Sequence, residues 1–470
     1  MSRSASVSTR PTSLRGSGGG AGSADDRGNI ADRAAPTAPE GTGNESNQPV
    51  PVKMFAALGI RNYRLFFSGQ VVSNTGTWMQ RIAQDWLVLQ ITDSPLAVGI
   101  TTALQFLPML LFGLWGGLIA DRYPKRRLLL ATQMFMGLLA ALLAALTLTG
   151  HVQIWQVYLI AFGLGLATVV DNPSRQTFVN EMVPHELVRN AVSLNSGNFQ
   201  LARMLGPAVA GVVISAVGSG WAFGINAVSY LAPIAGLLAM RNTELQPQQR
   251  PVRGPGQIRE GLRYVRGQPA LLWPIVLVFF VGTFGYNFAI ILSAYTKEVF
   301  ASGADVYGLL NTAMAGGSVV GALLAARRST GRLSVLFGSA AGVGLLLVLL
   351  GLTPWFWPFV GLLVITGLTS VTFNTLGNST VQLASDPELR GRVMSLYMLV
   401  FMGGTPLGSI LVGAVTERWG APLALVLSGG VCLSAALGAA LLAARSTGVS
   451  VRVDLHRGAA HHVNLIKHSG

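Results

Sequence analysis

The chain has 470 residues, of which 51% are hydrophobic and only 11% are charged, whereas about 25% of residues are charged in soluble globular domains. With a mean hydropathy of +0.51, this composition excludes an ordinary soluble enzyme and predicts an integral membrane protein. The net charge of +14 would suit a nucleic-acid partner, but the cations lie in short loops between apolar runs. There they are typical of topology signals and lipid headgroup contacts, so we expect a lipid bilayer and no nucleic acid as partner.

Residues 1–52 are rich in Ser, Gly, Ala, Pro and charge. Because such a segment buries too little apolar surface to fold, we expect a disordered cytoplasmic N-terminal tail. Residues 54–64 should form a short amphipathic lead-in at the membrane surface. Segments of about 20 apolar residues, the length that spans a bilayer, are predicted at about 65–91, 95–120, 128–149, 153–174, 190–216, 219–240, 271–293, 305–327, 332–352, 355–376, 390–415 and 420–444.

The fold class is therefore predicted as all-α integral membrane, with twelve transmembrane helices in two pseudo-symmetric six-helix bundles. We expect the N-terminal bundle at 53–240, a cytoplasmic linker with an amphipathic helix at 241–270, the C-terminal bundle at 271–444 and a cytoplasmic tail at 445–470. Loops on one side carry many arginines, and the opposite loops carry only Lys297 and Arg418. The positive-inside rule then places both termini in the cytoplasm.

An internal repeat supports the division into two halves. A shift of 202 residues aligns Gly206 with Gly408, Gly211 with Gly413, and residue 218 with residue 420, which is also glycine. Two halves related by an axis along the membrane normal would produce this pattern, so the fifth and eleventh segments should be equivalent.

A turn of four cations and one carboxylate joins the second and third segments. It resembles the loop signature G-x-x-x-D-R-x-x-[KR]-[KR] of the major facilitator superfamily and has Pro124 where that family usually has glycine. The resemblance implies a cytoplasmic gate, to which we assign Gly117, Asp121, Arg122, Lys125, Arg126 and Arg175.

Charged residues inside spans are expensive and are therefore functional candidates. In the first segment Arg81 and Asp85 lie four residues apart on one face, which Gln70, Asn74, Thr77 and Trp78 extend. This stripe either lines the substrate path, with Asp85 as proton acceptor or cation contact, or holds a structural Arg81–Asp85 pair.

The fifth segment carries Arg203 near its middle, with Gln200 on the same face. A buried arginine needs a partner, which is either Asp85 within the N-terminal half or an anionic group of a substrate. In the latter case Arg81 and Arg203 would form a cationic pocket.

The fourth segment ends with Asp171 and Arg175 on either side of Pro173, which should end or kink the helix. These charges are either part of the cytoplasmic gate, pairing with the Asp121 turn when that side closes, or a proton site at Asp171. Gly206, Pro207 and Gly211 resemble the Gly-Pro signature of antiporters in the superfamily, although a seam of small packing residues would explain them equally.

The C-terminal half has no carboxylate well inside a span. It offers aromatic and amide groups, part of which we assign to the substrate path as an adaptable apolar wall and part to ordinary packing. The candidates are Tyr286, Asn287, Phe373, Asn374, Tyr397 and Phe401.

Residues 61–66 (RNYRLF), 86–89 (WLVL), 92–95 (TDSP) and 171–176 (DNPSRQ) are similar to the twelve-span bacterial multidrug and siderophore exporter branch of the superfamily, which is typified by enterobactin exporters. That resemblance implies proton-coupled alternating access in a bacterial cytoplasmic membrane, with Asp85 as first and Asp171 as second candidate for proton coupling. No nucleophile–base set or Walker loop is recognised, so we expect no enzyme. We also expect no cofactor besides the proton gradient, no metal, and a monomer.

Three functions remain open from the sequence. The first is proton-coupled export of small amphipathic molecules such as drugs, secondary metabolites or siderophores. The second is uptake or uniport of a small metabolite, and the third is a non-transporting sensor or assembly partner on the same fold.

Overall fold

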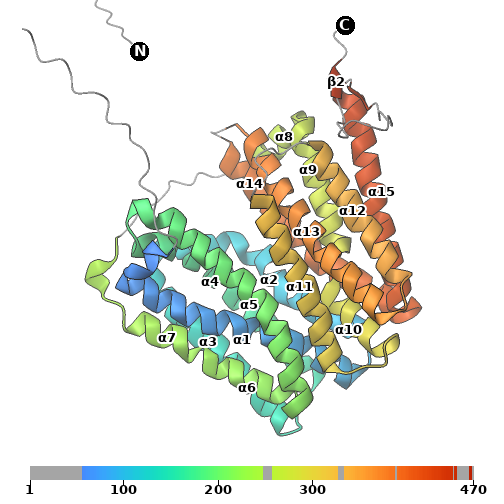
Figure 1. Cartoon of the computed structure of the whole chain (residues 1–470). Coiled ribbons are helices and arrows are strands. Elements are labelled where there is room, and N and C mark those ends of the chain that lie inside the picture. Colours follow the sequence, from blue (N-terminus) through green and yellow to red (C-terminus); the bar gives the residue numbers. More distant parts are fainter. Residues whose placement is uncertain are drawn as a thin grey trace, which may run out of the picture. The chain divides into compact units, whose positions relative to one another are not determined.

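The computed structural model describes residues 55–246, 257–326, 333–386, 389–447, 449–451 and 465–467. The N-terminal tail at 1–52 and the middle of the linker therefore lie outside the described residues. Long helices make up nearly all of the described chain (Figure 1). The predicted all-α fold is confirmed.

The N-terminal half consists of six spans. They are α1 (Arg61–Thr92), α2 (Pro95–Arg122), α3 (Lys125–Leu148), α4 (Ile154–Met182), α5 (Val188–Val217), and the pair α6 (Ser219–Ser229) and α7 (Leu231–Leu238). Short 3-10 turns precede or join them at Ala56–Gly59, His185–Leu187 and Asn242–Glu244. The turn at Ala56–Gly59 packs on the half itself, because the backbone N–H of Ala57 donates to Oδ1 of Asn190 on α5 at 3.0 Å.

The C-terminal half follows the linker helix α8 (Gln257–Gly267). It contains α9 (Pro269–Phe280), a π-helical turn at Val281–Gly285, α10 (Phe288–Glu298), α11 (Ala304–Ala326), α12 (Leu333–Gly351), α13 (Phe356–Ala384), α14 (Arg390–Trp419) and α15 (Ala421–Thr447). A short antiparallel pair, β1 (Val449–Val451) and β2 (Leu465–Lys467), follows α15.

Eleven helices of the described chain are long and apolar enough to cross a membrane. The one predicted span that is not among these eleven is the first, α1, which has ample length at 32 residues. Its polar side chains, among them Gln70, Gln84 and Asp85, are buried, so the low hydropathy of α1 reflects contacts inside the protein.

The repeat seen in the sequence is matched by α5 and α14. Each has 30 residues, and each ends at a glycine with positive φ, Gly218 at 89° and Gly420 at 82°. Only glycine adopts such a conformation without steric strain, so the same residue ends both helices.

Of the two outcomes expected at Pro173, an end or a kink of the helix, the end is not seen. Pro173 lies inside α4, which continues to Met182. Proline removes one backbone donor and does not by itself stop a helix when packing holds the flanking turns. Phe178 and Met182 beyond it are buried in the core, which accounts for the continuation.

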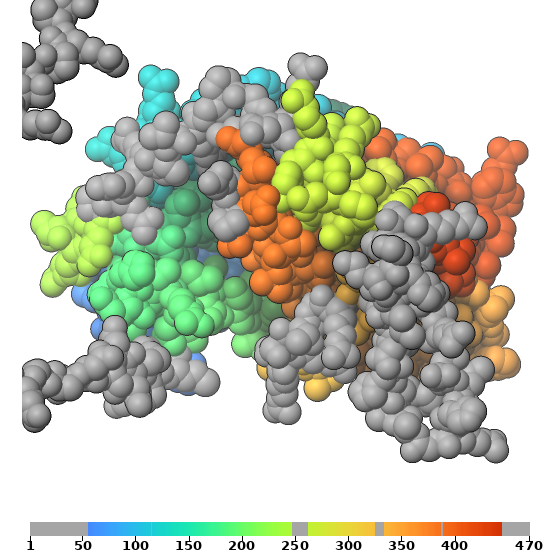
Figure 2. All heavy atoms as spheres, turned by 90° about the horizontal axis from the view of Figure 1, so that it is seen from above, coloured from blue at the N-terminus to red at the C-terminus, as the bar shows by residue number. Residues whose placement is uncertain are grey.

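The helix α8 lies beside the start of α14 on one face of the C-terminal half, as Figure 2 shows. The Tyr264 hydroxyl donates to Oδ2 of Asp386 at 2.7 Å, and Val265 is buried while Leu262 and Arg263 are exposed. These contacts fix α8 on the C-terminal half.

The most extensive contacts between the two halves are those of α2 with α14 and of α5 with α11, and α10 adds smaller contacts with α1 and α2. Both pairs approach at glycines. A Cβ placed on Gly99 would lie 2.4 Å from the carbonyl oxygen of Ser409, and one on Gly308 would lie 2.7 Å from Cα of Gly211. We call this side of the molecule, where the turn at Asp93 joins α1 to α2, the Asp93 end, and the opposite side the Asp121 end.

Candidate functional site

Asp85 is the carboxylate through which α1 contacts the other half. It is buried, and its Oδ2 accepts a hydrogen bond from the Tyr307 hydroxyl on α11 at 3.4 Å. The adjacent Trp86 stacks on the Tyr307 ring with centroids 5.8 Å apart. Asp85 therefore lies in an interface whose partner residue belongs to the C-terminal half.

A second group of side chains, from α1, α2 and α5, surrounds Trp78. The Arg81 guanidinium lies 5.0 Å from the Trp78 ring centroid and 5.6 Å from that of Phe106, and the Arg203 guanidinium lies 5.7 Å from Trp78. The Phe199 ring meets Trp78 edge-on at 5.6 Å. We call these five residues the Trp78 cluster.

The arginines of this cluster are placed by cation–π contacts, which hold a guanidinium near the negative face of an aromatic ring. Among the described residues, neither Arg81 nor Arg203 has a carboxylate within 4 Å, so the alternative of a direct Arg81–Asp85 salt bridge is not seen.

The Gly-Pro seam lies where α5 packs on α1 of its own half and on α11 of the other half. A Cβ on Gly206 would lie 2.4 Å from the Trp78 Cβ, so glycine at this position lets α5 approach the Trp78 cluster. One helical turn after Pro207, Gly211 faces Ala304 and Gly308 of α11. The three predicted seam residues thus connect the Trp78 cluster to the contact between halves.

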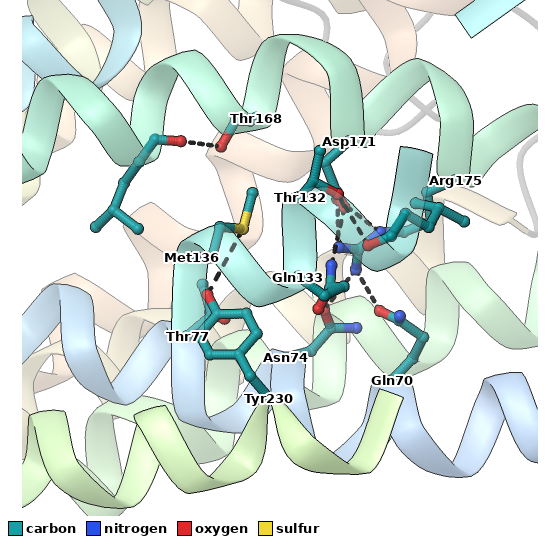
Figure 3. A network of polar contacts seen from close by, with 12 residues as sticks. Gln70, Asn74, Thr77, Thr132, Gln133, Met136, Thr168, Asp171, Arg175 and Tyr230 are labelled. Atoms are coloured by element: carbon teal, nitrogen blue, oxygen red, sulfur yellow. Dashed lines mark hydrogen bonds and ion pairs between the residues drawn. The ribbon is translucent and has the colours of Figure 1, made fainter. Parts of the chain in front are cut away.

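Asp171 is the centre of a separate polar network within the N-terminal half (Figure 3). Its Oδ1 accepts hydrogen bonds of 2.8 Å from both Thr132 and Gln133 on α3, and Arg175 pairs with Oδ2. Asp171 is 1% exposed. Both carboxylate oxygens are satisfied, and the network joins α3 to α4.

Arg175 extends this network to α1. Its guanidinium also donates to Oε1 of Gln70 and, at 3.2 Å, to Oδ1 of Asn74. The polar stripe predicted along α1 is therefore divided into four groups. Gln70 and Asn74 belong to the Asp171 network, and Thr77 contacts the Tyr230 hydroxyl at 3.3 Å. Trp78 and Arg81 belong to the Trp78 cluster, and Asp85 contacts Tyr307.

Five of the six residues assigned to the gate lie at the end of α2 and the start of α3. Lys125 pairs with Glu181 of α4 at 2.5 Å, and Arg126 donates from Nε to the carbonyl of Leu237 on α7 at 2.7 Å. Arg122 is exposed and Asp121 is half-buried. These contacts join α3 to α4 and α7.

The close helix approach that the motif requires falls at Gly116, beside Gly117. A Cβ on Gly116 would lie 2.1 Å from the carbonyl oxygen of Val169 on α4. Arg175, the sixth residue assigned to the gate, lies in the Asp171 network, where it contacts Asp171, Gln70 and Asn74.

The aromatic residues predicted for the C-terminal half divide into two groups. Tyr286, Tyr397 and Phe401 form one ring cluster, with Tyr286 and Phe401 centroids 6.2 Å apart and Tyr397 and Phe401 stacked at 6.4 Å. Phe373 is buried in the core. Asn374, like Gln200 on α5, is half-buried.

The ring cluster begins where α9 and α10 are interrupted. The turn at Val281–Gly285 is π-helical, and Asn287 after it donates to the carbonyl of Thr283 at 2.6 Å. Gly404 and Gly408 of α14 pack directly on Thr283. Such π-turns are frequent at functional sites, and Tyr286 directly after this one packs on Phe401 and donates from its hydroxyl to the carbonyl of Ser370 at 3.0 Å.

Several residues of these groups were missed by the sequence analysis, among them Tyr307, Phe106 and Glu181. Tyr307, Phe106 and Glu181 each contact a predicted residue, but they lie 222, 25 and 56 positions away from that partner. Helical spacing gives no signal over such separations. Tyr307 could have been noticed as a tyrosine inside an apolar span.

Comparison with known proteins fixes the family. Residues 52–457 match the family model described as transmembrane secretion effector. The chain belongs to the transmembrane secretion effector family of major facilitator superfamily transporters. The superfamily resemblance stated from the Asp121 turn is thereby confirmed.

Curated relatives of this transporter include exporters and other carriers. It is 24% identical over 363 residues to a staphyloferrin A transporter of Staphylococcus aureus, covering 76% of this chain and 90% of the relative. It is 23% identical to macrolide efflux protein A of Streptococcus pyogenes, covering 80% and 95%. An enterobactin exporter of Shigella flexneri is 23% identical, covering 75% and 84%.

Solved structures agree on the fold. A bacterial homologue of the human lysosomal transporter Spinster, in an inward-facing and unoccupied conformation, superposes with a TM-score of 0.64 at 14% identity, covering 82% of this chain and 97% of that one. The chain is therefore a multi-pass membrane transporter with two six-helix halves.

Proposed function

We propose that this transporter exports small amphipathic molecules by proton-coupled alternating access. The family is one of transporters, and three relatives named above are a siderophore transporter, a macrolide efflux protein and a siderophore exporter. The cargo would be a drug, a secondary metabolite or a siderophore. We place the protein in a bacterial cytoplasmic membrane with both termini in the cytoplasm, on the basis of the arginine-rich loops.

The observation that carries proton coupling is the Asp85–Tyr307 contact. A coupling carboxylate must change its affinity for protons between the two states of the transporter. Because the partner of Asp85 lies on the opposite half, movement of the halves changes the surroundings of this carboxylate. Asp171 has its partners within one half, so we keep Asp85 as the coupling residue and assign Asp171 a structural role.

The contacts at the Asp93 end indicate which state is described. Lys297, Ser94 and Glu417 join the halves there, and with the orientation above this end faces outward. The structure then corresponds to a state closed to the outside, in which cargo enters from the Asp121 end. The gate residues Asp121, Arg122 and Arg126 would act when that end closes.

The test is efflux of a fluorescent substrate from cells that carry wild type or Asp85→Asn, with and without a proton uncoupler. We expect efflux by wild type that the uncoupler stops, and none by Asp85→Asn at equal membrane abundance. Asp305→Asn, which neutralises an exposed carboxylate at the start of α11, is the matched control and should export normally. Unchanged efflux by Asp85→Asn would remove Asp85 from the mechanism, and efflux that persists after uncoupling would contradict proton coupling.

A further inference from the structure

Two arginines lie well inside membrane spans of the N-terminal half. Arg203 is at the middle of α5, and Arg81 is about three turns from the end of α1. Charges at such depth are costly and mark substrate pathways or ion pairs. Among the described residues, neither guanidinium has a direct ion-pair partner within 4 Å. Asp85, one turn from Arg81 on the same helix, is the nearby carboxylate of α1.

Both guanidinium groups are placed around one indole. Arg81 and Arg203 lie 5.0 Å and 5.7 Å from the Trp78 ring centroid. An organic cation that approached this ring would meet two positive charges, and the indole face it needs is already occupied by the protein's own cations. The same two positive charges would attract an anion.

Apolar rings lie beside the two guanidinium groups. Phe199 packs against Trp78, and Phe106 lies under Arg81. Trp78, Arg81, Phe106 and Arg203 are all partly accessible in the structure. Charge and apolar surface are thus side by side.

We propose that the cargo of this transporter is an amphipathic carboxylate, whose anionic group binds Arg81 and Arg203 and whose apolar part packs on Trp78, Phe106 and Phe199. Guanidinium groups bind carboxylates through paired hydrogen bonds in a fixed planar geometry. This inference rests on the proposed export function and names its substrate class. Export of an anion is also favoured by an inside-negative membrane potential, which acts on each charge that crosses.

Neutralising Asp85 should change the affinities for anionic and cationic ligands in opposite directions. It lies four residues after Arg81 on the same face of α1, and its carboxylate repels a bound anion. Asp85→Asn therefore strengthens binding of a carboxylate ligand while it weakens binding of a cationic one. A structural role for the two arginines would give neither change.

The experiment measures ligand-induced thermal stabilisation of the purified full-length protein, which reports binding to the folded state. The probes are aromatic carboxylates, with the methyl ester and the trimethylammonium analogue of each as neutral and cationic matches. We expect carboxylates to stabilise wild type. The matched compounds should bind at least about tenfold more weakly, a difference that corresponds to one good charge-assisted contact. Arg81→Gln and Arg203→Gln should lose the carboxylate effect, and Arg203→Lys should keep part of it.

Arg418→Gln is the matched control, because Arg418 also lies over a tryptophan, Trp419 at 5.6 Å, but is exposed at the Asp93 end. It should bind as wild type does. Preference of wild type for the cationic analogues, absence of stabilisation by every carboxylate, or equal binding by the arginine variants would overturn the proposal. If cells export the cationic compounds in an uncoupler-sensitive manner, the export function stands and this inference alone fails.

Discussion

The ammonium group of Lys297 lies 2.6 Å from the carboxylate of Asp93, and this ion pair joins the C-terminal half to the N-terminal half. Asp93 has a left-handed backbone, with φ of 53°, in the turn between α1 and α2. The first residues of α2 are held from the same side, because Glu417 of α14 accepts from the Ser94 hydroxyl and, at 3.2 Å, from the Leu96 backbone N–H. We call these three contacts the Asp93 clasp.

The clasp should open and close during transport. Both members of the Asp93–Lys297 pair are largely exposed, so the pair contributes at most about 1 kcal/mol and can be broken readily. In the double variant Asp93→Cys/Lys297→Cys, a short bifunctional thiol cross-linker should stop export, and cleavage of the cross-link should restore it. The native Cys432 is buried, so background reaction is low, and the two single variants serve as controls. Full export by the cross-linked protein would show that this end does not open.

Glycine at position 308 should be required for closure of the Asp93 end. A Cβ there would lie 2.7 Å from Cα of Gly211, and this contact is with backbone, which cannot move aside as a side chain would. Gly308→Ala should therefore keep α5 and α11 apart and reduce export severalfold. Gly316→Ala on the same helix meets nothing within 4 Å and should export normally, with stability equal or higher by about 1 kcal/mol because alanine favours helix. Equal export by the two variants would contradict this assignment.

The Asp171 network should stabilise the N-terminal half. Asp171→Asn leaves Arg175 without its carboxylate partner in a largely buried site, and removal of one member of such a pair destabilises by about 3 kcal/mol. Thermal unfolding of the purified protein should show a clear decrease in Tm, and Asp305→Asn should show none. The same variant should still export in proportion to its folded amount. Loss of proton coupling with unchanged Tm would instead make Asp171 the coupling site.

The Tyr307 hydroxyl should matter for coupling more than for folding. Tyr307→Phe removes the hydroxyl that bonds to Asp85 at 3.4 Å and to the carbonyl of Ala289 at 3.2 Å, and keeps a ring to stack on Trp86. We expect proton-driven export to decrease at least about tenfold, as for loss of a hydrogen bond to a charged group, while counterflow exchange of labelled for unlabelled cargo continues. Tyr295→Phe is the control, since that hydroxyl bonds to the carbonyl of Thr353 within the C-terminal half. Equal losses of exchange and driven export would point to a folding defect.

The sequence was sufficient for features that depend on local pattern. Runs of apolar residues predicted the spans, and the shift of 202 residues predicted that the fifth and eleventh spans are equivalent, as α5 and α14 are. The sequence was insufficient where distant elements meet. Whether Pro173 ends the fourth helix could not be read from that local signal, because the burial of Phe178 and Met182 depends on tertiary packing.

The candidate site shows the same difference. Arg81, Trp78 and Arg203 were all found as polar or aromatic groups inside spans, but their arrangement around one indole depends on how closely α5 approaches α1 at Gly206. Tyr307 was missed because a single tyrosine carries no spacing pattern. One helical stripe was read as one functional unit. The packing of α4 and α5 against α1, together with the side chains of Tyr230 and Tyr307, divides it among four sets of partners.

The central claim is that a proton moving inward through Asp85 drives cargo outward. Its most direct measurement is cargo flux in proteoliposomes with an imposed pH gradient, comparing wild type with Asp85→Asn. We expect wild type to accumulate cargo on the more acidic side, and we expect reversal of the gradient to reverse the flux. Asp85→Asn should exchange cargo across the membrane without accumulating it on either side. Accumulation by wild type that ignores the direction of the gradient, or unchanged accumulation by Asp85→Asn, would contradict it.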